Sequence, residues 1–392
     1  MKKDSRWIKL IIGCITLFAA GVIYAWSVLS GPFKTAFPSW SISGIQLCFT
    51  LTLCFFCLGG LASGLLAKRF SIRLRMLVAA LMILSGFTIT GTMNGSILIL
   101  YLGYGVLAGF GIGIVYNVVI AATNAWFPDK KGLSSGSLMM AFGFSALFFS
   151  KVSQKLFAIQ SVGWRNTYLT LGAVIGGIIL LAAFLIKAPK GEKKAAQESE
   201  NDVSTKEMLK RASFYMLFVF FTLLAAVGST AIGFGKNYFV SVGLGENAAV
   251  TVAGLLSIFN GLGRLFSGAL FDRVGLRKTQ FATSFVAIAS PLTALFAVML
   301  SSPVLGVIGL SLCAFLYGFA PTVSAAMIGG FYGMKHFPLN FPVLNLDLIP
   351  ASFVSTLAGR LFEVSAGYLS TFIVLTVMSV VGLIVNISIK KA

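Results

Sequence analysis

Apolar runs long enough to cross a lipid bilayer follow one another along almost the whole chain. A helix of about 20 apolar residues spans the hydrocarbon core of a membrane, and runs of that length recur throughout. They predict twelve membrane-spanning helices, over residues 7–29, 43–66, 75–93, 97–121, 134–157, 166–187, 213–235, 248–271, 279–300, 303–328, 340–362 and 366–389. The polar stretch between the sixth and seventh helices has no apolar periodicity, which is typical of a linker.

A short pattern occurs twice, about half a chain apart. It reads GLLAKRFSIR from Gly64 and GALFDRVGLR from Gly268. In both copies small residues allow close helix packing, and a tight basic turn follows at the membrane surface. We therefore expect an all-α membrane protein whose twelve helices form two pseudo-symmetric six-helix bundles, an architecture typical of a carrier. The N-terminal bundle is expected over 1–187, a cytoplasmic linker over 188–212 and the C-terminal bundle over 213–392.

Composition and charge agree with a membrane protein. Hydrophobic residues make up 57% of the chain and charged residues 10%, which leaves too little polar surface for a soluble globule. The formal charge of +19 is compatible with nucleic-acid binding, but most of the 30 basic residues fall at the ends, in the linker and in alternate loops. This distribution predicts a multi-pass protein of the inner, cytoplasmic membrane with both termini in the cytoplasm. We expect a monomer that contacts lipid and binds no nucleic acid.

Patterns that would indicate catalysis or a bound cofactor are missing. The chain shows no nucleophile paired with a base and no phosphate-binding glycine loop. Cys54 and Cys57 form a C-x-x-C in mid-helix without a second ligand pair, so we interpret them as buried small hydrophobes. The glycine-rich run from Gly103 to Gly113 is interpreted as a surface for close helix packing. We expect no enzyme activity, no cofactor and no metal.

Two charged residues lie deep within predicted spans. Arg264 is eight residues from Asp272 at the membrane face, about 12 Å along a helix, and Asp347 is about 15 Å into its own span. An isolated charge in hydrocarbon costs at least a few kcal/mol, so each must face a partner or an aqueous cavity. One interpretation is a structural Arg264–Asp347 ion pair. The one we favour is a cavity in which Arg264 meets an anionic substrate.

Three other charges within the spans carry less information. Lys151 either reaches the outer surface with its long side chain or supplies a second cation in the cavity. Arg360 and Glu363, three residues apart, share a helix face and predict a local ion pair or an outer gate.

Several motifs together resemble the oxalate/formate antiporter family of the major facilitator superfamily. They are Arg6-Trp7, GVIYAWS from Gly21, GIGIVY from Gly111, WFPDKKGL from Trp126, and Asn260-Gly261 with Arg264. The resemblance covers essentially the whole chain. It implies two bundles around a central cavity that opens alternately to either side, and small organic anions carried by exchange or with protons.

The resemblance also implies roles for single residues. Arg264 matches a carboxylate-binding arginine, and Tyr24, Tyr116 and Tyr317 fall at aromatic positions that line the substrate cavity. Such an aromatic box suits a planar carboxylate, which a guanidinium can hold through two charge-assisted hydrogen bonds. The paired basic turns imply gating residues, which are Asp272, Arg273, Arg69 and Arg73.

The chain also departs from this family. Leu348 falls where the oxalate carriers place a second, charge-neutralising lysine, and Lys68 and Ser71 replace the usual acid and glycine of the first basic turn. Because a dicarboxylate needs two charges compensated, the missing lysine favours a monocarboxylate such as formate, lactate or pyruvate over oxalate. Asp347, next to Leu348, is a candidate for proton coupling.

The expected function is therefore secondary transport of small carboxylates, as an exchanger or a proton symporter. Three alternatives stay open at this point. They are an exporter of drugs or amphipathic metabolites, a non-transporting membrane sensor on the same scaffold, and, ranked below these, an intramembrane enzyme.

Overall fold

Helices form all the regular structure of the described residues. A computed structural model describes the chain except for residues 1–2, 190–201, 355–360, 362–366 and 390–392. Within the described residues, eleven helical segments are long and apolar enough to cross a membrane. One of them, α14 (Glu246–Met299), comprises two helices joined at Gly275, whose φ of 79° glycine adopts at little cost. The eighth and ninth predicted spans both lie within α14, and the expected all-α membrane fold is confirmed.

The helices group into two compact units. The first comprises residues 1–129 and 141–197, and the second residues 130–140 and 198–392. The boundary near residue 140 lies inside one continuous helix, α8 (Lys131–Ala158). The first turns of α8 thus pack with the second unit, although they precede the central linker in the sequence.

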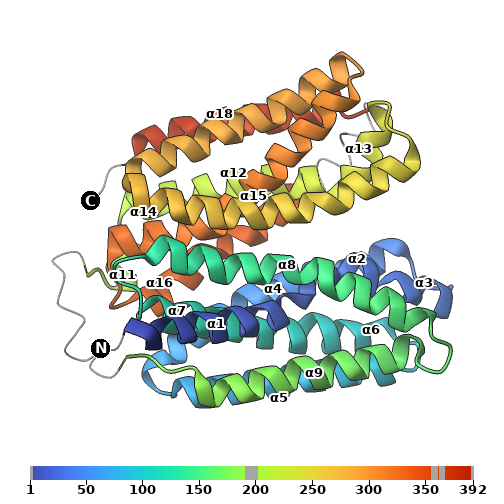
Figure 1. Ribbon diagram of the computed structural model, residues 1–392, viewed down its shortest axis with the longest axis horizontal. Helices are drawn as coiled ribbons and strands as arrows, with labels where there is room; N and C mark the ends of the chain where they lie inside the picture. The colour runs from blue at the N-terminus through green and yellow to red at the C-terminus, as the bar shows by residue number, and fades with distance from the viewer. Residues whose placement is uncertain (1–2, 190–201, 355–360, 362–366, 390–392) are drawn as a thin grey trace. The chain divides into compact units, whose positions relative to one another are not determined.

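The first unit contains long helices and, between them, three short ones. They are α1 (Lys3–Ala20), α2 (Trp26–Leu29), α3 (Gly31–Ala36), α4 (Ile42–Leu65), α5 (Ile72–Thr92), α6 (Ile97–Leu100), α7 (Gly109–Asn124), the later part of α8, and α9 (Gly163–Leu185). Helix α5 packs along α9, and α4 along α7 (Figure 1). The backbone tightens to a 3-10 turn at Gly21–Ala25 and widens to a π-helix at Tyr101–Ala108.

Glycines of the fourth span account for the close approach of α7 to its neighbours. A Cβ added at Gly109 would lie 2.8 Å from the carbonyl oxygen of Thr52, and one at Gly111 would lie 2.9 Å from that of Ala79. The side chain of a larger residue would therefore collide with the backbone of the neighbouring helix. The packing role predicted for this glycine-rich run is confirmed.

The second unit contains the remaining helices. They are α11 (Thr205–Met208), α12 (Ala212–Gly233), α13 (Gly235–Ser241), α14, α15 (Pro303–Tyr332), α16 (Phe337–Leu344) and α18 (Leu369–Ser388). Helix α14 packs along α15 and α18, and α12 packs against the same two helices (Figure 1). After α16 the chain tightens to a 3-10 turn at Asn345–Asp347 and becomes helical again over 348–354. Pro350 has no N–H to donate to the carbonyl of Leu346, which accounts for the break.

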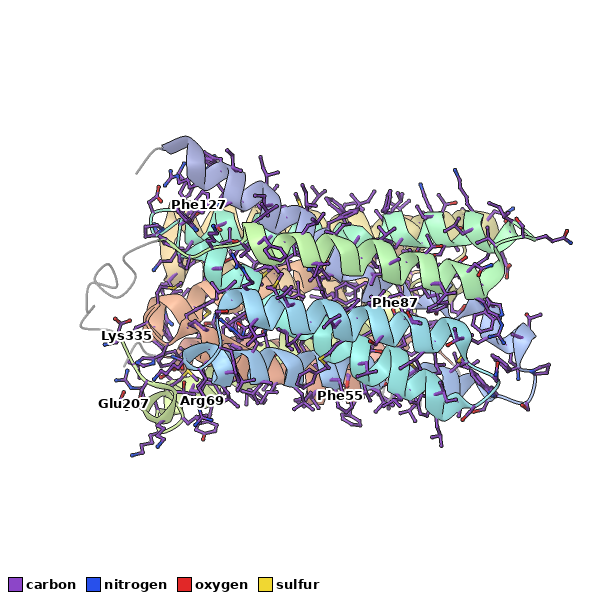
Figure 2. The ribbon with its side chains drawn as sticks, turned by 90° about the horizontal axis from the view of Figure 1, so that it is seen from below. Phe55, Arg69, Phe87, Phe127, Glu207 and Lys335 are labelled. Carbon is purple, nitrogen blue, oxygen red and sulfur yellow. The ribbon has the colours of Figure 1, made fainter. Side chains whose placement is uncertain are left out.

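The central linker is ordered at its C-terminal end. The N–H of Val203 donates to the carbonyl of Tyr332 (3.0 Å), and the buried Asn340 bonds both the carbonyl of Val203 (3.1 Å) and the hydroxyl of Thr205 (2.6 Å). Figure 2 shows Glu207, in α11, at the same end of the second unit as Lys335. The expected linker 188–212 therefore includes a segment docked on α15 and α16, while 190–201 lies outside the described residues.

Candidate functional site

Arg264 lies within α14 and is almost fully buried, with 2% of its surface exposed. Two hydrogen bonds fix its guanidinium. Nε donates to Oδ1 of Asn260, one turn earlier on the same helix (3.0 Å), and Nη1 donates to the backbone carbonyl of Met139 on α8 (2.7 Å). Both acceptors are neutral, so these two contacts orient the positive charge without neutralising it. A cation placed in this way within a membrane segment is the strongest indication of a functional site in the second unit.

Asp347 is the second buried charge of this unit. It lies in the 3-10 turn after α16 and is 5% exposed. The break in the helix places Asp347 where the backbone is irregular, and irregular backbone within membrane segments is tolerated where protein or an internal cavity surrounds it.

Tyr317 and Leu348 lie close together in the second unit. Both pack against a small apolar cluster made of Ala225, Ala226 and Ala351. The residue predicted to contribute an aromatic surface thus shares its surroundings with the leucine that replaces the lysine of the oxalate carriers. Leu348 thus packs against apolar side chains.

Helix α15 packs closely against the backbone of Arg264 at Gly318, the residue that follows Tyr317. A Cβ added at Gly318 would lie 2.8 Å from the backbone nitrogen of Arg264 and would overlap the carbonyl oxygen of Asn260. Close packing through this glycine fixes the position of Tyr317 along the helix relative to Arg264.

Tyr24 and Tyr116 come together in the first unit around one phenylalanine. Tyr24 lies in the 3-10 turn of the first span and contacts the ring of Phe142 edge-on, with ring centroids 5.4 Å apart. Tyr116, in α7 and 6% exposed, contacts Phe142 at 5.0 Å and Phe56 at 5.1 Å. The structure therefore joins the two predicted tyrosines into one aromatic cluster.

Asp272 binds the beginning of α8. Its Oδ1 accepts the N–H of Gly132 (2.9 Å) and its Oδ2 accepts the N–H of Leu133 (2.7 Å). The first N–H groups of a helix lack partners within it, and a carboxylate satisfies them and interacts favourably with the helix dipole. The predicted gating acid thus holds the N-terminus of α8 against α14.

Small residues let the two helices meet along this stretch. A Cβ at Gly132 would overlap the carbonyl oxygen of Gly268, and one at Gly136 would lie 2.7 Å from the carbonyl oxygen of Arg264. We call this contact the α8–α14 interface, meaning residues 132–139 of α8 and 264–272 of α14.

The arginines predicted to gate transport have different surroundings. Arg273 and Arg69 are exposed, and Figure 2 shows Arg69 at the end of the first unit that also carries Phe127. The guanidinium of Arg73 lies over the ring of Phe184, 5.1 Å from its centroid. Lys151 is also exposed. The predicted contact of Arg360 with Glu363 lies outside the described residues.

Two of the motifs that resemble the family contact each other in the first unit. Arg6 forms an ion pair with Asp129 (2.8 Å), and its guanidinium lies 5.1 Å from the ring centroid of Phe127. Trp7 meets the same ring edge-on at 5.3 Å. These contacts tie α1 to the connection between α7 and α8, which explains why the Arg-Trp pair and the Trp-Phe-Pro-Asp turn occur together.

Sequence reasoning missed two residues that shape the site. Met139 contributes a backbone carbonyl, to which no sequence pattern points. Phe142 is one of 36 phenylalanines, and only its ring contacts with Tyr24 and Tyr116 distinguish it. The i, i+4 spacing of Asn260 and Arg264 was the signal available for the other contact.

Comparison with known proteins gives the family. The Major Facilitator Superfamily profile matches residues 7–337, and the chain belongs to this superfamily. The oxalate:formate antiporter of Oxalobacter formigenes is 30% identical over 279 residues, covering 70% of this chain and 66% of that protein. Monocarboxylate transporter 12 of Mus musculus is 26% identical over 325 residues, covering 73% of this chain and 65% of that protein. The matched region thus spans slightly less than two thirds of each relative.

A solved structure shares the fold. The Major Facilitator Superfamily transporter FucP, in its outward conformation, aligns with 99% of this chain and 100% of its own, with a TM-score of 0.76 and 17% identity. The chain is therefore a multi-pass membrane protein of a superfamily of transporters, which are not enzymes. The similarity to the oxalate/formate antiporter family and to monocarboxylate carriers is confirmed.

Proposed function

We propose that this protein is a secondary active transporter of small monocarboxylates such as formate, lactate or pyruvate, working by alternating access. The observation that carries the proposal is the buried Arg264, a cation within a membrane segment whose guanidinium is oriented by Asn260 and by the carbonyl of Met139. A guanidinium offers a carboxylate two parallel, charge-assisted hydrogen bonds. The relatives named for oxalate, formate and monocarboxylates support the same substrate class.

A monocarboxylate fits the charge of the second unit better than oxalate does. Leu348, which falls where the oxalate carriers have a lysine, packs against the same apolar cluster of alanines as Tyr317. One buried cation balances one carboxylate, whereas a second charge in a dry site would remain uncompensated. Tyr24 and Tyr116 supply, in this proposal, the aromatic surface that contacts the substrate.

Asp347 is the proposed coupling residue. It is buried in a break of the helix. A carboxyl group in such a place can bind and release a proton as its surroundings change, which would link anion entry to proton entry. Exchange of one carboxylate for another remains the alternative mode for the same site.

The remaining parts of the proposal concern placement and gating. We propose that the protein acts as a monomer in the inner, cytoplasmic membrane with both termini in the cytoplasm, as the distribution of basic residues favours. Asp272, bound to the start of α8, would act in the gate on that side together with Arg273, Arg69 and Arg73. This role for Asp272 is supported by its two hydrogen bonds to α8.

The test is uptake of labelled carboxylates into proteoliposomes, with and without a pH gradient. The panel contains formate, lactate, pyruvate and oxalate. We expect Arg264→Lys and Arg264→Gln both to abolish uptake while the protein still inserts, because lysine keeps the charge but not the planar two-point contact. Lys236→Gln is the matched control, since it removes an exposed cation whose ion pair with Glu246 is long, at 3.8 Å. Wild-type uptake by Arg264→Gln would refute the proposal.

A further inference from the structure

Besides its proposed role in substrate binding, Arg264 contacts a second helix. Its Nη1 donates to the carbonyl of Met139, one of the residues of α8 that belong to the second unit. Eight residues further along α14, Asp272 accepts the N–H groups of Gly132 and Leu133. The α8–α14 interface is thus held by one side chain at each end.

Glycines bring the two backbones of this interface together at two further points. Gly132 lies against Gly268, and Gly136 lies against the carbonyl of Arg264. Glycines at both points remove side chains that would interlock the helices. Contact surfaces made of small residues allow helices to separate or slide, and the side chains of Arg264 and Asp272 add polar links that hold the helices together.

We propose that the substrate carboxylate takes Nη1 of Arg264 from the carbonyl of Met139, so that substrate binding releases α8 from α14. This inference rests on the proposed function of Arg264. A carboxylate is a charged acceptor and forms a stronger hydrogen bond with a guanidinium than a neutral carbonyl does. Asn260 holds Nε throughout and keeps the guanidinium in place while the acceptor at Nη1 changes.

The exchange of acceptors gives substrate a means of shifting a conformational equilibrium. A ligand shifts an equilibrium only by interacting differently with the two states. The state in which α8 is bound to Arg264 uses an N–H of Nη1. In this proposal the bound carboxylate takes that N–H, so the substrate favours the released state. Helix α8 continues without interruption from Met139 to Phe142, which contacts Tyr24 and Tyr116. A change at Arg264 would therefore reach the aromatic cluster along one helix.

Coupling of this kind is reciprocal, which separates it from a merely structural contact. If substrate weakens the interface, weakening the interface must strengthen substrate binding by the same factor. Gly136→Ala is the variant for this test, because its Cβ would lie 2.7 Å from the backbone oxygen of Arg264 and would force the helices apart beside Met139. Gly254→Ala is the matched control on α14, because a Cβ there has nothing within 4 Å.

The experiment measures the interface directly in the full-length protein. Spin labels are attached at the exposed positions Lys130→Cys and Val274→Cys, in a background whose native cysteines are replaced by alanine and whose uptake is verified. Distances are recorded with and without saturating formate, lactate and pyruvate. Binding of the same carboxylates is measured separately by calorimetry.

We expect a bound carboxylate to lengthen the distance in the wild-type sequence. Gly136→Ala should show the longer distance without substrate and bind the carboxylate about fivefold more tightly, while Gly254→Ala behaves as wild type. A carboxylate that binds without changing the wild-type distance would overturn this inference alone, even if Gly136→Ala fails to fold. Weaker binding by folded Gly136→Ala would also overturn it. If no carboxylate binds the wild type, the proposed function fails as well.

Discussion

Replacing Asp272 should disable the transport cycle while leaving substrate binding intact. Its carboxylate accepts two N–H groups at the start of α8, at 2.9 and 2.7 Å. Asp272→Asn keeps one acceptor oxygen and loses one hydrogen bond, worth about 0.5–1.5 kcal/mol, together with about 0.3–1 kcal/mol of interaction with the helix dipole. Asp272→Lys loses both bonds and places a positive charge at the positive end of the helix.

These terms set the expected sizes of the effects. A loss of about 1.4 kcal/mol changes an equilibrium tenfold, so Asp272→Asn should shift the closed α8–α14 interface toward separation by about that factor. For Asp272→Lys, two lost bonds and the unfavourable dipole interaction sum to about 2–4 kcal/mol, or about a hundredfold shift. Net uptake should fall in the same order, because a gate that does not close cannot complete the cycle.

The assay compares uptake into proteoliposomes with carboxylate binding in detergent, for the same preparations. We expect uptake to fall from wild type to Asp272→Asn to Asp272→Lys, while binding is no weaker than in the wild type. The control is Glu246→Lys, which reverses a charge on the same helix at a side chain that is 77% exposed and forms a long ion pair; exposed pairs contribute less than about 1 kcal/mol. The reasoning is refuted if binding by Asp272→Lys falls as far as its uptake.

Two further predictions concern the second unit. Asp347→Asn mimics the protonated acid, so it should abolish uptake driven by a pH gradient while exchange of carboxylate for carboxylate remains measurable; unchanged proton-driven accumulation would exclude the coupling role. Asn340→Leu removes the two hydrogen bonds to Val203 and Thr205, so it should destabilise the docked linker segment by about 1–3 kcal/mol. The measurement is the rate of proteolytic cleavage at residues 202–211, which should rise in this variant, and an unchanged rate would show that the segment is held by other contacts.

The sequence was sufficient for the fold because its strongest signal is also the strongest physical constraint. Lipid requires long apolar helices, so run length alone gives the spans. Run length could not show where those helices depart from regular α-helical geometry. The 3-10 turn before Trp26 and the π-helix from Tyr101 have the same apolar composition as the regular helices around them. The break near Asp347 was better marked, since Pro350 follows three residues later.

Without the family resemblance, the candidate site was predictable only where charge marked it. A buried arginine in a membrane span stands out because of its energetic cost, and Arg264 is indeed buried. Its acceptor on α8 is a backbone carbonyl, and every residue has one, so no side-chain pattern could single out Met139. The repeated basic turn likewise marked Asp272. The two N–H groups that Asp272 binds, at the start of α8, became evident only from the structure.

The boundary between the two units inside α8 matters for any attempt to divide the chain. A cut in the central linker leaves residues 130–140 on the N-terminal fragment, although they pack with the second unit. Asp272 and Arg264 would then remain on the C-terminal fragment without the α8 groups that they bind. If two such fragments were made in one cell, each would carry one side of the same contact. The beginning of α8 would then be the segment through which the fragments associate.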